Sequence, residues 1–258
     1  MKYKEVIAHI VQWLKQYAEQ SGCNGFVIGI SGGIDSAVTS TLCALTGKHV
    51  WALNMPIHQH LAEYTRAQEH IVWLTSKFAN VTAQEVNLTA TFESLASALP
   101  EGIRDWLTMA NARSRLRMTT LYAFASHHKL LVAGTGNRVE DFGVGFFTKY
   151  GDGGVDLSPI ADLMKSEVFA LAKELEIVNS IQVAAPTDGL WADGRSDEDQ
   201  IGATYDELEW AMKFLTTDME KEITARQKEI LKIYIERNKA NRHKMVPIPV
   251  CTIPVEIK

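Results

Sequence analysis

Short apolar runs alternate with longer amphipathic segments along the first half of the chain. The short runs, which predict buried strands, cover residues 26–30, 49–56, 83–89 and 129–135, the third only weakly. The amphipathic segments carry apolar side chains at helical spacing and cover residues 4–20, 35–47, 62–79 and 101–127. Strands that alternate with helices predict an α/β, Rossmann-like fold, in which helices flank both faces of a parallel sheet.

Loops and helices dominate the second half. Residues 136–165 are glycine-rich and carry several aromatic side chains, so we expect a functional loop and not a disordered one. Helices are predicted at residues 166–177, 205–215 and 222–244. Residues 186–204 have the composition of a mobile loop, and three prolines predict an extended tail at 245–258. We expect residues 1–258 to form a single domain.

Composition narrows the class of protein. A net charge of −5 over 258 residues is not typical of a general nucleic-acid binder. No stretch reaches the roughly 20 apolar residues of a membrane span, and the N-terminal segment lacks the pattern of a signal peptide. Cys23, Cys43 and Cys251 are far apart and form no metal-binding or disulfide pattern. We therefore expect a cytoplasmic protein with reduced cysteines and no nucleic-acid or membrane partner.

Residues 29–36 (GISGGIDS) have the composition of a phosphate-binding turn. A strand, a glycine turn and a helix start together present backbone N–H groups and a helix dipole to an anion. Asp35 would repel a phosphate unless a cation lay between them, so this residue indicates a bridging Mg²⁺. The alternative is a tight turn in which Asp35 caps the helix. Residues 134–137 (GTGN) also follow a predicted strand, so both loops are expected at one crevice.

The loop resembles the pyrophosphatase loop of the N-type ATP pyrophosphatases, which adenylate a carboxyl or carbonyl oxygen and release pyrophosphate. The resemblance implies the fold of that group, and it implies that the loop residues bind ATP. These residues are Gly29, Ile30, Ser31, Gly32, Gly33, Ile34, Asp35 and Ser36.

Further segments resemble the NAD synthetases within this group. Residues 111–118 (NARSRLRM) precede GTGN, and residues 145–168 (GFFTKYGDGGVDLSPIADLMKSEV) are close to the signature of the bacterial enzymes. The dipeptides PT at 186–187 and HK at 243–244 follow in the family's order. The resemblance implies Mg²⁺-dependent amidation of deamido-NAD to NAD⁺ by ammonia and ATP, through an NAD-adenylate, with release of AMP and pyrophosphate. It also implies a homodimer.

The functional residues of the family are carried over position by position. The resemblance implies that Asp35 and Glu140 bind Mg²⁺ and that Lys165 acts in catalysis. We expect Asp152, a nearby carboxylate, to act in catalysis by accepting a proton from ammonium. The further ATP-binding residues it implies are Thr135, Lys165 and Thr187. The implied deamido-NAD-binding residues are Arg115, Lys149, Asp156, His243 and Lys244.

Two departures from the family pattern fall in the site. The segment between Glu140 and GFF is one residue longer than expected. This leaves Glu140 or Asp141 as the metal ligand, and alignment from the N-terminal side favours Glu140. Gly136 stands where the family usually has Asp or Ser after Gly-Thr.

Alternatives concern the nitrogen donor and the activity. Free ammonia is expected because the chain has no nitrilase-like domain, and a separate glutaminase partner is the alternative. A tRNA-modifying relative should show basic patches and catalytic cysteines, which the sequence lacks. A nucleotide-binding sensor without catalysis is the third alternative, and the presence of Asp35, Glu140, Lys149 and Lys165 argues against it.

Overall fold

The computed structural model of the chain describes residues 1–187, 197–217 and 222–258. Within these residues, four parallel strands form one sheet with the order β3-β2-β1-β4. The strands are β1 (Gly25–Gly29), β2 (His49–Asn54), β3 (Val81–Glu85) and β4 (Leu130–Val132). Val27 of β1 pairs with Trp51 of β2 on one side and with Val132 of β4 on the other. The predicted α/β fold with a parallel sheet is confirmed.

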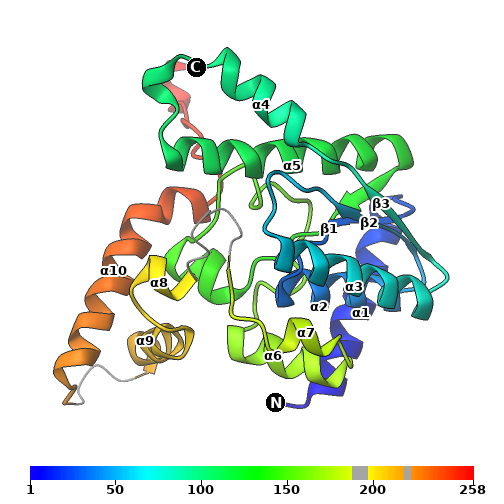
Figure 1. Cartoon of the computed structure of the whole chain (residues 1–258). Helices are drawn as coiled ribbons and strands as arrows, with labels where there is room; N and C mark the ends of the chain where they lie inside the picture. The colour runs from blue at the N-terminus through cyan, green and yellow to red at the C-terminus, as the bar shows by residue number, and fades with distance from the viewer. Residues whose placement is uncertain (188–196, 218–221) are drawn as a thin grey trace.

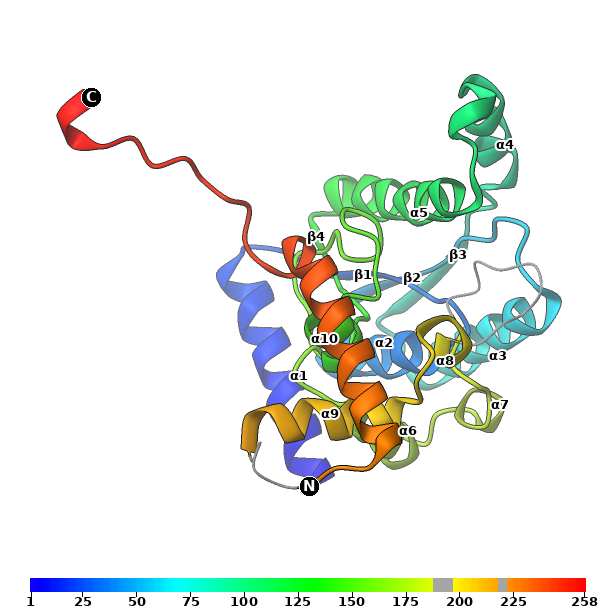
Figure 2. The same ribbon diagram turned by 90° about the vertical axis from the view of Figure 1, so that its left-hand side faces the viewer.

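Helices cover both faces of this sheet (Figures 1 and 2). One face carries α1 (Tyr3–Gln20), α2 (Ile34–Leu45), α3 (Leu61–Lys77) and α6 (Lys165–Glu174), and the other carries α4 (Thr89–Ala98) and α5 (Trp106–His128). Phe26 and Ile28 of β1 join the core shared with α1 and α2, whereas Val27 joins the core on the α5 side. Burial on both faces explains the uninterrupted apolar run of this strand.

A smaller layer packs beside the sheet and has its own apolar cluster around Leu208, Met212 and Ile230. Its elements are the π-helix η2 (Val139–Val144), α8 (Asp197–Ile201), α9 (Tyr205–Thr217) and α10 (Ala225–Met245). The short helix α7 (Asn179–Gln182) follows α6. The last turn of α10 carries His243 and Lys244, and it lies near the carboxyl ends of the strands. Residues 246–258 then run away from the body of the molecule in Figure 2 and end in η3 (Val255–Ile257).

Several predicted boundaries were wrong. Helix α4 was not predicted, and the third strand covers residues 81–85 and not 83–89 because Val81 and Thr82 pair with Val50 and Trp51. The long helix begins at Trp106 and not at 101, since the Asp105 side chain accepts the Thr108 N–H at 3.0 Å and caps it. The turn η1 (Glu101–Ile103) precedes it.

The two predicted loops of the second half also contain regular structure. The π-helix η2 lies within residues 136–165, and α8 lies within residues 186–204. The remainder of the second loop, residues 188–196, lies outside the described residues. In the described parts of the chain, no helix has both the length and the apolar character that crossing a membrane requires.

We expect His70 to make the stability of the fold depend on pH. This side chain is fully buried, with Nε2 2.9 Å from Ser40 Oγ and its ring stacked on Trp73. Burial lowers the pKa of His70 to about 4. A histidine in the unfolded chain titrates near ~6.5, so between these values the unfolded state binds a proton that the folded state does not. The free energy of unfolding therefore falls as the pH drops through this window, by about 3 kcal/mol from this residue.

Urea unfolding of the His70→Leu variant at pH 7.5 and pH 5 measures this contribution. The variant should lose less stability than the wild type on acidification. His9→Leu, at an exposed position of α1, is the matched control and should keep the wild-type dependence. An unchanged pH dependence in His70→Leu would contradict the assignment.

Candidate active site

A cavity of about 950 Å³ lies at the carboxyl ends of β1 and β4. Its volume is that of a site for a nucleotide-sized ligand. The loop after β1 and residues Gly134 and Thr135 after β4 both line it, so the expectation that these two loops share one crevice is confirmed. Every predicted site residue lines this cavity except Asp156.

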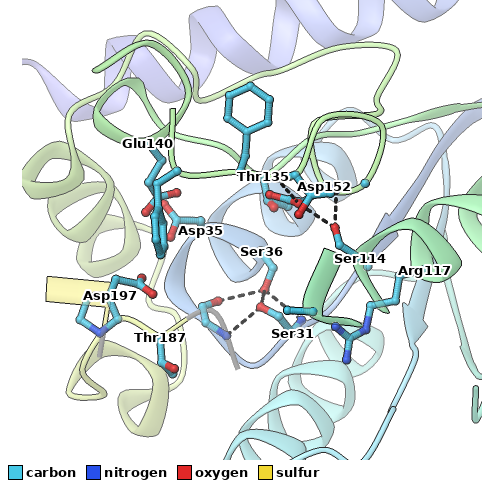
Figure 3. Close-up of a pocket in the computed structure, with 18 of the residues that line it drawn as sticks. Ser31, Asp35, Ser36, Ser114, Arg117, Thr135, Glu140, Asp152, Thr187 and Asp197 are labelled. Atoms are coloured by element: carbon cyan, nitrogen blue, oxygen red, sulfur yellow. Dashed lines mark hydrogen bonds between the residues drawn. The ribbon is translucent and has the colours of Figure 1, made fainter. Parts of the chain in front are cut away.

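Hydrogen bonds among residues 31–36 fix the conformation of the loop after β1 (Figure 3). Ser31 Oγ and Ser36 Oγ are 3.0 Å apart, the Gly33 N–H donates to Ser31 Oγ at 3.1 Å, and Ser36 Oγ donates to the Gly33 carbonyl at 2.9 Å. Gly32 has φ +84°, and the Arg66 side chain donates to its carbonyl at 3.1 Å. The arrangement presents hydroxyl groups and the start of α2 to the cavity, as a site for phosphate oxygens requires.

Lys165 is the central charge of the cavity floor. This first residue of α6 is 3% exposed, and its ammonium group donates to Asp35 Oδ2 at 2.5 Å and to Glu140 Oε1 at 3.0 Å. Asn137 donates to the other oxygen of Asp35 at 3.1 Å, and the Tyr205 hydroxyl donates to Glu140 Oε1 at 2.5 Å. Two carboxylates and one lysine from distant parts of the sequence therefore form one buried ionic cluster.

The protonation of this cluster follows from its charges. Burial alone would lower the pKa of Lys165, but the carboxylates of Asp35 and Glu140 raise it above the usual value, so the amine is charged. Burial raises the pKa of Asp35, and the Lys165 ammonium opposes this rise. Burial also raises the pKa of Tyr205, so its hydroxyl keeps its proton and remains a donor to Glu140.

Asp152 lies on the opposite wall, beneath α5. Its Oδ1 accepts hydrogen bonds from Ser114 Oγ at 2.7 Å and from the Thr148 N–H at 3.0 Å, and its own N–H donates to Ser114 Oγ at 2.8 Å. Figure 3 shows this pair facing the cavity. Burial raises the pKa of Asp152, and the hydrogen bonds from Ser114 and Thr148 oppose the rise. A carboxylate with a raised pKa at the edge of a ligand cavity suits general-base chemistry.

Basic residues line the outer part of the cavity. Arg115 donates to the Lys149 carbonyl at 3.3 Å through Nη2, and Lys149 Nζ donates to the His243 carbonyl at 2.8 Å. Lys244 Nζ donates to the carbonyls of Gly145 and Phe147, the second at 2.6 Å. The glycine-rich segment before α6 is thus tied to α5 on one side and to the end of α10 on the other.

Asp156 lies apart from these residues. Its carboxylate accepts from the Tyr122 hydroxyl at 3.0 Å and from the Val132 N–H at 2.8 Å, so it anchors the segment to β4 and α5. The structure does not bring it to the wall of the 950 Å³ cavity.

Glu140 and Asp141 lie in the π-helix η2, the segment in which the extra residue is expected. A π-helix has a wider turn than an α-helix, and such insertions recur at functional sites. Glu140 faces Lys165 and the large cavity, whereas Asp141 turns the other way and lies against Gly136. A Cβ at position 136 would come within 2.1 Å of both Asp141 carboxylate oxygens, so a side chain there would require the Asp141 side chain to move.

Comparisons with known proteins agree with this geometry. The sequence model of the family described as NAD synthase matches residues 6–247. The NH(3)-dependent NAD(+) synthetase of Mesoplasma florum is 39% identical over 212 residues, which are 81% of this chain and 84% of the relative. That of Methanosarcina acetivorans is 32% identical over 259 residues, which are 96% of this chain and 99% of the relative. The solved structure of NMN synthetase from Francisella tularensis has a TM-score of 0.85 at 33% identity and covers 99% of both chains.

The chain belongs to the NAD synthase family. Its activity is therefore ammonia-dependent synthesis of NAD⁺ from deamido-NAD and ATP, by a carbon–nitrogen ligase. The resemblance read from the loop and from residues 145–168 is confirmed. The family is wider than the bacterial enzymes, since archaeal relatives also match.

Several residues of this NAD synthase site were missed in the sequence. Asn137 donates to Asp35, Tyr205 donates to Glu140, and Ser114 donates to Asp152. Arg117 also lines the cavity, and its side chain donates to the Met55 carbonyl and to Gln59. Asn137 and Ser114 lie inside the quoted motifs GTGN and NARSRLRM, so the motifs themselves pointed to them. Tyr205 had no such signal, because it starts an ordinary amphipathic helix.

We expect Gly32→Ala to weaken ATP binding about 100-fold, because the new Cβ would lie 2.4 Å from the Glu63 carbonyl oxygen in α3 and would displace the loop. The variant should also lose roughly 1–3 kcal/mol of stability through backbone strain. Gly47→Ala is a matched control, since Gly47 also has a positive φ of +73° but its Cβ would meet no atom within 4 Å. Calorimetric titration of ATP separates the two variants. Equal ATP affinities would show that the contact with α3 is unimportant.

Proposed function

We propose that residues 29–36, Thr135, Lys165 and Thr187 bind ATP, and that Arg115, Lys149, His243 and Lys244 bind deamido-NAD. The support is their meeting in one cavity, where three lysines and an arginine offset the charge of two phosphate-rich substrates. Asp156 is assigned to the dinucleotide from the resemblance alone, since it lies outside this cavity.

The reaction then follows in two steps. A carboxylate oxygen of the nicotinate ring attacks the α-phosphorus of ATP, and the bond from that phosphorus to the bridging oxygen breaks, which gives NAD-adenylate and pyrophosphate. Ammonia next attacks the activated carbonyl carbon, AMP leaves, and the nitrogen loses a proton to give the amide of NAD⁺. Lys165 and the start of α2 stabilise the charge that develops on the phosphates. Asp152 accepts the proton of ammonium that must leave before the nitrogen can attack.

Asp35 and Glu140 are the proposed Mg²⁺ ligands. Two carboxylates that converge on one point suit Mg²⁺, which usually takes one or two protein carboxylates with phosphate oxygens and water. The described residues contain no cluster of three or more acidic, histidine or cysteine side chains that could hold a metal alone, which fits an ion that arrives with ATP. When bound, Mg²⁺ supplies positive charge to the triphosphate.

We also propose a cytoplasmic homodimer. Cys23, Cys43 and Cys251 are all free thiols, as expected in a reducing compartment. The tail exposes apolar side chains that a second copy could cover, among them Val250 at 84% and Val255 at 83% exposure. Light scattering on the purified protein measures the mass in solution, and a monomer at micromolar concentration would contradict the dimer.

A second candidate activity is amidation of the mononucleotide. The Francisella tularensis structure is named NMN synthetase and covers 99% of this chain at 33% identity. The bond made is the same, and only the adenylyl half of deamido-NAD would be absent. The ratio of kcat/KM for deamido-NAD to that for nicotinate mononucleotide tests this, and a ratio below one would make the mononucleotide the preferred substrate.

The experiment that tests the proposal measures AMP and pyrophosphate from ATP, Mg²⁺ and deamido-NAD, with ammonium or glutamine as nitrogen source. Turnover with ammonium alone is expected. Turnover that needs an added glutaminase would identify a partner as the donor. Tight ATP binding with no pyrophosphate for any acceptor would favour the sensor.

A further inference from the structure

Arg66 is a cation of the large cavity to which the proposed function assigns no role. It lies on α3, and its Nε donates to the Gly32 carbonyl of the loop after β1 at 3.1 Å. In the described parts of the chain, neither terminal nitrogen of its guanidinium group makes a hydrogen bond or an ion pair. The side chain is half-buried, so its charge is partly desolvated and favours an anionic partner.

The other arginines of the cavity bind the protein itself. Among the described residues, Arg115, Arg117 and Arg237 also line this cavity. Each of them donates a terminal nitrogen to an oxygen of another residue. Arg66 differs from them, because both terminal nitrogens of its guanidinium group remain available to a ligand.

Helix α3 contacts the loop directly at this point. A Cβ on Gly32 would lie 2.4 Å from the Glu63 carbonyl oxygen and 3.0 Å from the Ala67 nitrogen. Arg66 belongs to the same helical turn, and its bond to the Gly32 carbonyl holds the guanidinium group beside the loop. The carboxylate of Glu63 accepts a hydrogen bond from Gln59 at 2.5 Å and forms no ion pair with Arg66 within the described ranges. The positive charge of Arg66 is therefore not neutralised by a carboxylate of the protein.

We infer that Arg66 is a further catalytic residue, which binds the pyrophosphate portion of ATP at the Gly32 end of the loop. Lys165 reaches the other end of the loop through Asp35. The inference rests on the proposed binding of ATP by residues 29–36. When the bond from the α-phosphorus to the bridging oxygen breaks, its electron pair passes to that oxygen, and negative charge grows on the leaving pyrophosphate. A guanidinium fork matches two phosphate oxygens and stabilises this charge.

Arg66→Gln and Arg66→Met separate phosphate binding from support of the loop. The amide nitrogen of glutamine lies at the position of arginine Nε, so Arg66→Gln keeps a donor for the Gly32 carbonyl but loses the fork and the charge. Arg66→Met loses the donor as well. We expect both variants to bind pyrophosphate, with Mg²⁺ present, about 10- to 100-fold more weakly than the wild type, the loss for one or two charge-assisted hydrogen bonds. Their affinity for AMP should be unchanged, and calorimetric titration measures both ligands.

The outcomes distinguish this inference from the proposed function. Unchanged pyrophosphate affinity in Arg66→Gln, whatever Arg66→Met shows, would overturn the inference and leave Arg66 as a support of the loop. A wild type that does not bind pyrophosphate would contradict the ATP assignment of the loop itself, and the inference with it. Lys77→Gln is the control and should bind pyrophosphate as the wild type does, since it removes a positive charge from the far end of α3, where the side chain is 41% exposed.

Single-turnover kinetics give an independent readout. The rate of pyrophosphate formation without ammonium should fall by about 100-fold in Arg66→Gln, because less charge is stabilised on the leaving group. KM for ammonium should not change, since the nitrogen reacts after pyrophosphate has formed. A rate of pyrophosphate formation equal to that of the wild type would show that Arg66 takes no part in this step and would overturn its catalytic role.

Discussion

Replacing Lys165 with methionine is expected to lower kcat by about three orders of magnitude, because the α- and β-phosphates lose a buried positive charge. The fold should also be destabilised by about 3–5 kcal/mol, the usual cost of leaving buried carboxylates without their cation. Asp35 and Glu140 would then face one another across the position of the lost ammonium group.

Added Mg²⁺ gives this prediction a specific signature. If Asp35 and Glu140 bind the ion, Mg²⁺ should raise Tm of Lys165→Met more than Tm of the wild type, since it would compensate two unpaired carboxylates. Lys213→Met is the matched control, because that lysine is 65% exposed and its Nζ forms a longer ion pair, at 3.7 Å, with Glu209 Oε2. Thermal unfolding with and without Mg²⁺, together with kcat, checks both parts. A variant with the stability of the wild type and no response to Mg²⁺ would contradict the account of this cluster.

The fold could be predicted from the sequence where burial imposes a regular pattern. β1 and β2 are buried on both faces and read as apolar runs, and α1 and α3 show helical spacing. Helix α4 carries one buried side chain, Phe92, and three residues separate it from the weak edge strand β3, so it has little pattern to detect. The five-residue helix α8 is too short for periodicity, and its Glu198 accepts the Tyr205 N–H through a tertiary contact.

The site was predictable to the extent that its residues lie in contiguous motifs. The loop after β1 and the segment 145–168 hold their chemistry in consecutive residues. The pairing of Lys165 with Asp35 joins residues 130 positions apart, and that of Tyr205 with Glu140 joins residues 65 apart, so local patterns carry no information on either. The different directions of Glu140 and Asp141 likewise depend on the π-helix, whose widened turn has no sequence period of its own.

The acidic groups of the site have different electrostatic settings. Asp35 and Glu140 share the charged ammonium group of Lys165. Asp152 instead accepts hydrogen bonds from Ser114 and Thr148, and burial raises its pKa. The proposed roles follow these settings, since the first suits groups that contact phosphates and the second suits a group that accepts a proton.

Asp152→Asn is expected to lower kcat at neutral pH by about 10²- to 10⁴-fold, the range that general-base catalysis contributes. The substitution keeps the shape of the side chain and an acceptor for Ser114, so stability should change little. Burial raises the pKa of Asp152 in the wild type, which brings the carboxylate nearer to the pH at which it must accept a proton. Without this base, turnover depends on ammonia that is already deprotonated in solution.

The pH dependence separates this role from a structural one. At constant total ammonium, kcat of Asp152→Asn should climb with pH as the share of free ammonia grows, and the deficit relative to the wild type should shrink. Ser114→Ala removes the donor that lowers the pKa of Asp152, so it should shift the wild-type profile to higher pH with a smaller loss of kcat. The pyrophosphate burst should be normal in both variants, because adenylation precedes the entry of nitrogen. If the profiles of Asp152→Asn and the wild type run parallel at every pH, Asp152 does not accept the proton, and the nitrogen donor must lose it before it reaches the site.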